Sequence, residues 1–122
     1  MAETKKLVVL ISRGFDDERS SVAWNVANGG IGSGLEVTAF LVSSGVDWVR
    51  KGAAEAAHLN PLDPSMKDMI GDFMSNGGTV MVCPPCAGVR GYKEEDLLNG
   101  VIITGSPAMH ALIKEGAATL SF

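Results

Sequence analysis

Residues 80–91 read Val-Met-Val-Cys-Pro-Pro-Cys-Ala-Gly-Val-Arg-Gly, and this stretch holds both cysteines of the chain. Its apolar run ends at Cys83, and two prolines then fix the backbone ahead of Cys86. We predict a strand over residues 79–83 that leads into a loop or the start of a short helix. A thiol between a strand end and a helix N-terminus is expected to have a lowered pKa. Because the thiolate is the reactive form, sulfur chemistry at Cys83 is the leading functional hypothesis.

Strand and helix patterns alternate on both sides of this segment. Apolar runs of strand length predict further strands at residues 7–12, 35–42, 101–104 and 118–122. Helices are expected after residue 18, ending at the glycines of 29–34, and over residues 46–57, 66–74 and 108–115, with Ser65 as the N-cap of the third. This alternation predicts a parallel α/β sandwich.

In such a sheet the functional crevice lies beyond the carboxyl ends of the strands. Three loops are expected there, at residues 12–17, 43–48 and 83–91, and Ser106 after the fourth strand is a candidate to join them. Candidate binding residues in these loops and beside them are Gly14, Asp16, Trp48, Ser106 and His110. Ordinary structural roles compete with these: Asp16 suits a helix cap, and Trp48 suits core packing.

The cysteine segment itself allows functional and structural interpretations. Cys83 is the candidate nucleophile, although free cysteine also packs well as a small hydrophobic side chain. Cys86 is a candidate resolving thiol, because the CxxC spacing permits a disulfide, or it has no task. Arg90 is a candidate to stabilise a thiolate or bind an anionic sulfur species, or it is an ordinary surface arginine.

Bulk composition narrows the class of protein. The 122 residues predict one domain spanning 1–122, and the net charge of −4 with scattered basic residues argues against nucleic-acid binding. The apolar run at residues 7–11 is too short for a signal-peptide core or a membrane span, so we expect a cytoplasmic protein. In that reducing compartment two cysteines favour catalysis or redox chemistry. Their spacing to His58 and His110 does not suit a metal site, and no cofactor is required.

Several sequence features, spread over essentially the whole chain, together resemble those of one known family. The first strand leads into a loop with glycine and aspartates at residues 14–19, Cys83 precedes Arg90 and Gly91 by seven and eight positions, and residues 100–105 read Gly-Val-Ile-Ile-Thr-Gly. In these features the chain resembles the DsrE/DsrF-like family, which includes sulfur-relay proteins. The resemblance implies a three-layer α/β/α sandwich with a mainly parallel five-stranded sheet, assembled into homo-oligomers such as trimers or hexamers.

The same resemblance implies that Cys83 carries persulfide sulfur between partner proteins. Our first hypothesis is therefore a sulfur carrier or sulfurtransferase that works with sulfur-donor and sulfur-acceptor proteins. A second is a thiol–disulfide redox protein that uses Cys83 and Cys86 together. A third is a non-catalytic oligomeric module that binds a ligand in the crevice, in which the cysteines only pack.

Overall fold

The structure is a computed structural model that describes residues 5–122, and its centre is a five-stranded sheet. The strands are β1 (Lys6–Ile11), β2 (Glu36–Leu41), β3 (Thr79–Val82), β4 (Ile102–Ile103) and β5 (Ala118–Ser121). Their order is β4-β3-β2-β1-β5, and every neighbouring pair is parallel. The predicted α/β fold with a parallel five-stranded sheet is confirmed.

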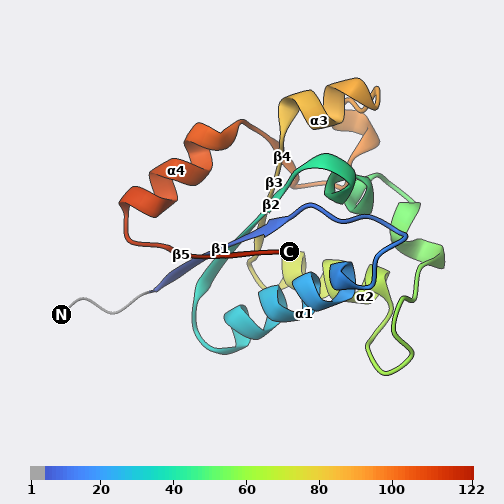
Figure 1. Ribbon diagram of the computed structural model, residues 1–122, viewed down its shortest axis with the longest axis horizontal. Helices are drawn as coiled ribbons and strands as arrows, with labels where there is room; N and C mark the ends of the chain where they lie inside the picture. The colour runs from blue at the N-terminus through green and yellow to red at the C-terminus, as the bar shows by residue number, and fades with distance from the viewer. Residues whose placement is uncertain (1–4) are drawn as a thin grey trace.

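Helices lie on both faces of this sheet. They are α1 (Arg19–Gly32), α2 (Met66–Ser75), α3 (Pro84–Val89) and α4 (Ser106–Lys114). In Figure 1, α1 and α2 cover one face, and α3 and α4 lie on the opposite face. Parallel strands need crossover connections, and these helices supply them, which gives the three layers of the fold.

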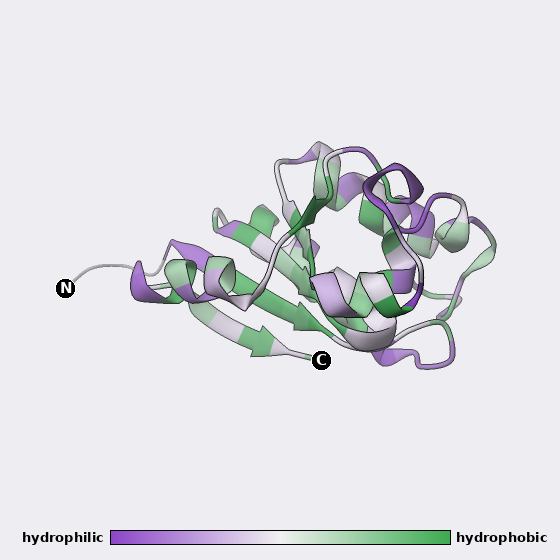
Figure 2. Ribbon diagram, turned by 90° about the horizontal axis from the view of Figure 1, so that it is seen from above, coloured by the Kyte–Doolittle hydropathy of each residue, from purple (hydrophilic) through white to green (hydrophobic). Residues whose placement is uncertain are grey.

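The main core fills the space between the sheet and the layer of α1 and α2. Leu7, Val9 and Ile11 of β1 belong to it, whereas Val8, also buried, alternates to the other face. Ser65 caps α2 by accepting a hydrogen bond from the Asp68 N–H at 3.2 Å, as predicted. Figure 2 shows the strands as an apolar band through the molecule. Within residues 5–122 no helix combines the length and hydropathy needed to cross a bilayer.

The predicted helix over residues 46–57 is wrong. This segment forms two short 3₁₀ helices, η1 (Ser43–Val49) and η2 (Ala53–Ala56), and Arg50 between them forms an antiparallel bridge with Leu97. Gly52 adopts φ 81°, a left-handed conformation that ends a helix. The alanine-rich composition favoured an α-helix, but the backbone break at Gly52 and the bridge outside the segment override it.

Helix ends also differ from expectation at the glycine cluster. The helix α1 continues through Gly29 and Gly30 to Gly32, and the chain turns only at Gly34, with φ 87°. A further 3₁₀ turn, η3 (Glu94–Asp96), lies between α3 and β4. Residues 1–4, which precede the apolar run in the signal-peptide argument, lie outside the described residues.

Candidate functional site

The loops that follow β1, β2 and β3 meet at the carboxyl edge of the sheet, where the sequence predicted them. The Ser43 N–H donates a hydrogen bond to Cys86 Sγ at 3.1 Å, which joins the second loop to the third. Trp48 Nε1 donates to the Arg13 carbonyl at 2.9 Å, which joins the second loop to the first. Gly14 packs so closely on Ser44 that an added Cβ would lie 3.0 Å from the serine Cβ.

Cys83 lies where β3 ends and α3 begins. Its N–H continues the sheet by donating to the Leu41 carbonyl at 3.0 Å. Cys83 is also the N-cap residue of α3. Cys86 is three positions later, at N3 of the helix. N-cap and N3 side chains lie next to each other in a helix first turn, so the CxxC spacing brings the two thiols together. Both cysteines are free and only partly buried.

The expectation of a lowered pKa at Cys83 is wrong. Burial raises the pKa of the Cys83 thiol, the nearby Cys86 amide opposes that rise, and the Cys86 thiol adds to it. The prolines supply the physical reason. Pro84 and Pro85 occupy the first two helical positions and have no N–H, so only the Cys86 amide remains in the first turn. With six residues, α3 also contributes little dipole.

Arg90 does not serve the Cys83 thiol directly. Its Nη1 donates to the Cys86 carbonyl at 3.1 Å, and its Nε lies 3.3 Å from Asp47 Oδ1. The Tyr92 hydroxyl donates to the same carboxylate oxygen at 2.6 Å. Burial raises the pKa of Tyr92, and the bond to Asp47 adds to that rise. Arg90 and Tyr92 therefore fasten α3 to η1 through Asp47, while Gly91 makes the turn after the helix with φ 74°.

Sequence reasoning missed Ser43, Asp47 and Tyr92. Ser43 follows a predicted strand, and that position was a signal of a site residue. Asp47 lies in the same predicted loop, but nothing local marked Tyr92 or the hydrogen bond that joins these two residues, 45 positions apart. A tyrosine near an aspartate becomes informative only after the fold brings them together.

The other candidate residues lie at varying places around this edge. Asp16 is exposed, and its neighbour Asp17 makes the ion pairs of the loop, with Arg19 at 2.8 Å and Arg13 at 3.2 Å. These bonds, led by Arg19, lower the pKa of Asp17 to about 2. Trp48 is fully buried and makes an edge-to-face contact with Phe15 at 4.6 Å between ring centroids.

Ser106 and His110 belong to α4 and are both exposed. Figure 1 shows α4 running away from α3, on the side of the sheet that carries β5. Within the described residues neither side chain forms a hydrogen bond with the cysteine segment. The carboxyl edge thus gathers Gly14, Trp48, Cys83, Cys86 and Arg90. Ser106 follows β4 at the same edge, where the Thr104 N–H donates to the carbonyl of Val82, next to Cys83, at 3.0 Å, whereas His110 lies one helical turn further along α4.

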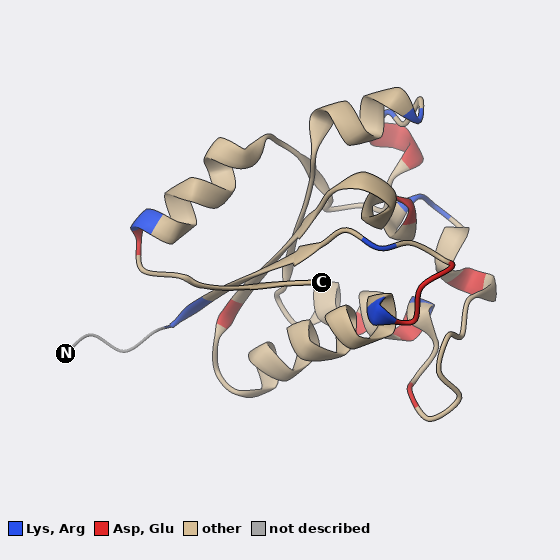
Figure 3. Cartoon of the chain, viewed as in Figure 1, with Lys and Arg blue, Asp and Glu red and all other residues tan. Residues whose placement is uncertain are grey.

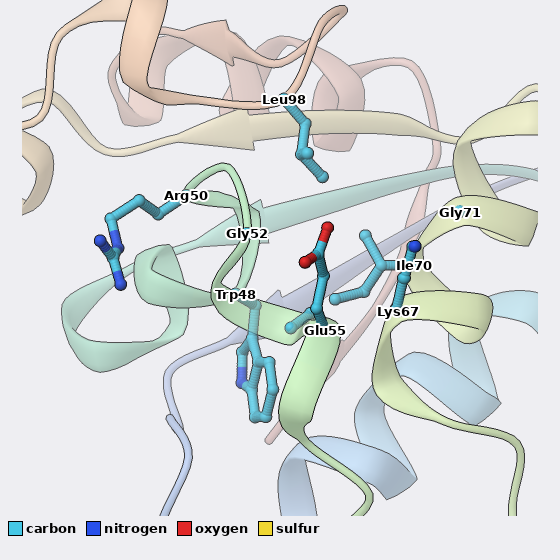
Figure 4. Close-up of a pocket in the computed structure, with 9 residues that line it drawn as sticks. Trp48, Arg50, Gly52, Glu55, Lys67, Ile70, Gly71 and Leu98 are labelled. Atoms are coloured by element: carbon cyan, nitrogen blue, oxygen red, sulfur yellow. The ribbon is translucent and has the colours of Figure 1, made fainter.

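A cavity of about 200 Å³ lies beside the buried Trp48. Figure 4 shows it between the η1–η2 segment and α2, with Ile70 and Leu98 facing its interior and Arg50 extended away. Its lining is mostly apolar and includes neither cysteine. In the described part of the chain, residues 5–122, no three His, Cys, Asp or Glu side chains gather in a way that could hold a metal ion.

Two solved structures share this fold. The ychN protein from E. coli superposes with a TM-score of 0.76 at 20% identity, covering 98% of this chain and all of that one. The protein of unknown function MTH1491 from Methanobacterium thermoautotrophicum gives the same TM-score at 17% identity, covering 96% and 98%. At these identities the likeness concerns the fold alone.

Sequence comparison finds archaeal relatives of nearly the same length. The uncharacterized protein MJ0989 of Methanocaldococcus jannaschii is 29% identical over 97% of this chain and 99% of its own. The uncharacterized protein MK0008 of Methanopyrus kandleri is 31% identical over 87% of this chain and 81% of its own. The model of the DsrE/DsrF-like family matches residues 5–122. The chain therefore belongs to the DsrE/DsrF-like family.

Proposed function

We propose that this protein is a cytoplasmic sulfur carrier that holds persulfide sulfur on Cys83. The observation that carries the proposal is the position of Cys83: its partly exposed thiol lies at the carboxyl edge of a DsrE/DsrF-like sheet. Open α/β sheets bind their ligands at this edge. Family membership supports a sulfur-relay role for a cysteine placed there.

The chemistry requires only thiols. The Cys83 thiolate attacks the outer sulfur of a donor persulfide, R–S–SH, and the donor leaves as its thiolate, RS⁻. Cys83 then holds the sulfur as Cys–S–SH until an acceptor thiolate attacks that outer sulfur and Cys83 leaves as a thiolate. The partners are thus a sulfur-donor protein and a sulfur-acceptor protein, and the reaction uses no metal or organic cofactor.

The raised pKa of Cys83 sets the conditions for this reaction. Because burial favours the neutral thiol, only a small fraction of Cys83 is nucleophilic at neutral pH. Loading is therefore expected to accelerate as the pH rises toward the pKa. A raised pKa counts against Cys83 as a fast nucleophile in both the carrier and the redox functions, and what supports the carrier is the position of Cys83 together with the family of the chain.

Thiol–disulfide exchange is the second candidate function. The observation that favours it is the N-cap and N3 placement of the two cysteines, which makes their thiols neighbours. A binding module in which neither cysteine reacts is the remaining alternative. We also propose that the protein assembles into homo-oligomers, such as trimers or hexamers, because α4 has no buried residue and large apolar side chains of α4, β4 and β5 are exposed.

Intact mass spectrometry tests these functions. The reduced protein and its Cys83→Ser and Cys86→Ser variants are incubated with an alkyl persulfide under oxygen-free conditions. A gain of one sulfur atom that is reversed by excess thiol, present in Cys86→Ser and absent in Cys83→Ser, supports the carrier. Loss of two hydrogen atoms on mild oxidation, requiring both cysteines, supports the redox function. No change in any form supports the binding module.

A further inference from the structure

Cys86 lies beside Cys83, the residue that we propose carries the sulfur. It is the N3 residue of α3, and its thiol interacts with that of Cys83 at the N-cap. Its carbonyl is held by Arg90, whose guanidinium is itself fixed by Asp47. These contacts hold the first turn of α3 in place, so Cys86 stays beside Cys83.

The backbone N–H of Ser43 donates a hydrogen bond to the Cys86 sulfur. The Ser43 N–H lies 3.1 Å from Cys86 Sγ, a short distance for a hydrogen bond to sulfur. Ser43 is the one residue other than glycine with positive φ, 51°, in the described chain. Such a conformation is strained for a residue with a Cβ and often marks a functional site. This hydrogen bond fixes the Cys86 sulfur beside Cys83, so the second thiol is held where it can attack the first.

We propose, on the basis of the proposed carrier function, that Cys86 discharges the Cys83 persulfide as hydrogen sulfide. The Cys86 thiolate attacks Cys83 Sγ, and a bond forms between the two cysteine sulfurs. The bond between Cys83 Sγ and the outer sulfur breaks, and its electron pair leaves with the outer sulfur as HS⁻. The protein ends as a Cys83–Cys86 disulfide. The sulfane sulfur is reduced, the two thiols are oxidised, and no external oxidant takes part.

The leaving groups favour this direction of attack. Attack on the outer sulfur would instead move the persulfide to Cys86 and expel the Cys83 thiolate. A thiol of higher pKa leaves more slowly, and burial raises the pKa of Cys83. Hydrogen sulfide is a stronger acid than an alkyl thiol, so HS⁻ leaves more readily. A dithiol reductant would return the disulfide to two thiols and complete a cycle that turns persulfide sulfur into free sulfide.

The test follows the fate of the loaded sulfur in the full-length chain. Wild type and the variants Cys86→Ser, Cys86→Ala and Cys83→Ser are loaded with cysteine persulfide without oxygen and desalted rapidly. Released sulfide is then measured colorimetrically, and intact masses are recorded over time. Val89→Ala is the matched control, because Val89 belongs to the same helix, is exposed and takes no part in the hydrogen bonds of either thiol.

Wild type and Val89→Ala should release about one sulfide per chain and end two hydrogen atoms lighter than the reduced protein. Both Cys86 variants should keep the added sulfur and release sulfide at least about tenfold more slowly. Cys83→Ser should release none. If wild type keeps its sulfur as long as the Cys86 variants do, the discharge is wrong and the carrier function stands. If folded Cys86 variants never gain sulfur, the carrier function and the discharge both fail.

Discussion

At the scale of single residues, the reactivity of Cys83 depends on its position at the end of β3. The strand β3 places the thiol at the sheet edge, where partial burial raises its pKa, and the two prolines remove amides that would offset this burial. Cys86 is also partly buried, but it accepts a hydrogen bond from the Ser43 N–H at its sulfur. The two thiols are therefore not equivalent, although they belong to one short motif.

This difference predicts the pH dependence of Cys83 alkylation. In wild type the rate with iodoacetamide should rise with pH to a midpoint above that of an ordinary cysteine, because burial and the Cys86 thiol both disfavour the thiolate. In Cys86→Ser one of these causes is gone, so the midpoint should shift to lower pH. Peptide mapping of the alkylated protein assigns the site. A wild-type midpoint below that of an unfolded control peptide would contradict the burial argument.

Asp17 predicts a second pH effect, in acid. Its pKa lies at about 2 in the folded protein, below the ordinary 3.8, mainly through its bonds to Arg19. A lowered pKa stabilises the folded state above the ordinary value, and this stabilisation is lost as the pH falls through about 2. The free energy of unfolding should therefore fall less between pH 5 and 2 in Asp17→Asn, measured by urea denaturation at low salt.

Asp16→Asn is the matched control, because it removes the same charge from the adjacent residue, which forms no ion pair within the described residues. Its acid profile should follow wild type. The pair at Asp17 is exposed, so high salt should reduce the difference between the two variants. Equal acid profiles for both variants at low salt would contradict a role for the Asp17 pairs.

At the scale of elements, η1 packs closely against the end of β1 through the backbone of Gly45. A Cβ added at Gly45 would lie 2.2 Å from the Ile11 carbonyl oxygen, which real atoms do not allow. Gly45→Ala should therefore cost about 1–3 kcal/mol of unfolding free energy, since the backbone must shift. Gly71→Ala in α2 is the control: open space surrounds it, and it should gain about 0.5–1 kcal/mol through helix propensity. Urea denaturation measures both, and equal effects would refute the contact.

The clamp between α3 and η1 makes another prediction at this scale. Tyr92→Phe removes the hydroxyl that donates to Asp47 at 2.6 Å, and leaves the partly buried ring in place. Loss of a hydrogen bond to a carboxylate should cost about 1–2 kcal/mol of unfolding free energy. Thermal and urea denaturation check this value. An unchanged stability would mean that the Arg90–Asp47 pair holds α3 without the tyrosine.

Elements were more predictable than their contacts. Each strand is a short apolar run with a turn signal beside it, so local pattern was enough to find all five and to predict their parallel arrangement. The segment of residues 46–57 failed because its alanines favour a helix locally, while Gly52 and the bridge from Arg50 to Leu97 impose another path. The cysteines were found from sequence, but the contacts of Ser43 and Asp47 join distant segments. The pKa direction of Cys83 depends on its burial in the fold and on the neighbouring Cys86 thiol.

At the scale of the whole molecule, one side of the sheet is incompletely covered. The helix α4 has no buried residue, and a groove of about 230 Å³ opens between it and the strands β1 and β5. Large apolar side chains remain exposed there and on β4: Ile102, Ile103, Ile113 and Leu120, between 36% and 46% accessible. Figure 3 shows that α4 carries charge only at its C-terminal end. An apolar surface of this kind on a small chain favours burial against another subunit.

The last prediction follows from that surface. Light scattering at micromolar concentration should show a multimer, and Leu120→Lys or Ile113→Glu should shift it toward the monomer, because each places a charge in the apolar contact. Leu62→Lys is the control: Leu62 is 94% exposed in a loop away from α4 and β5, so its change should leave the assembly intact. A wild-type monomer would mean that the exposed face serves no self-association. Dissociation by Leu62→Lys alone would place the subunit contact on the loop between η2 and α2 instead.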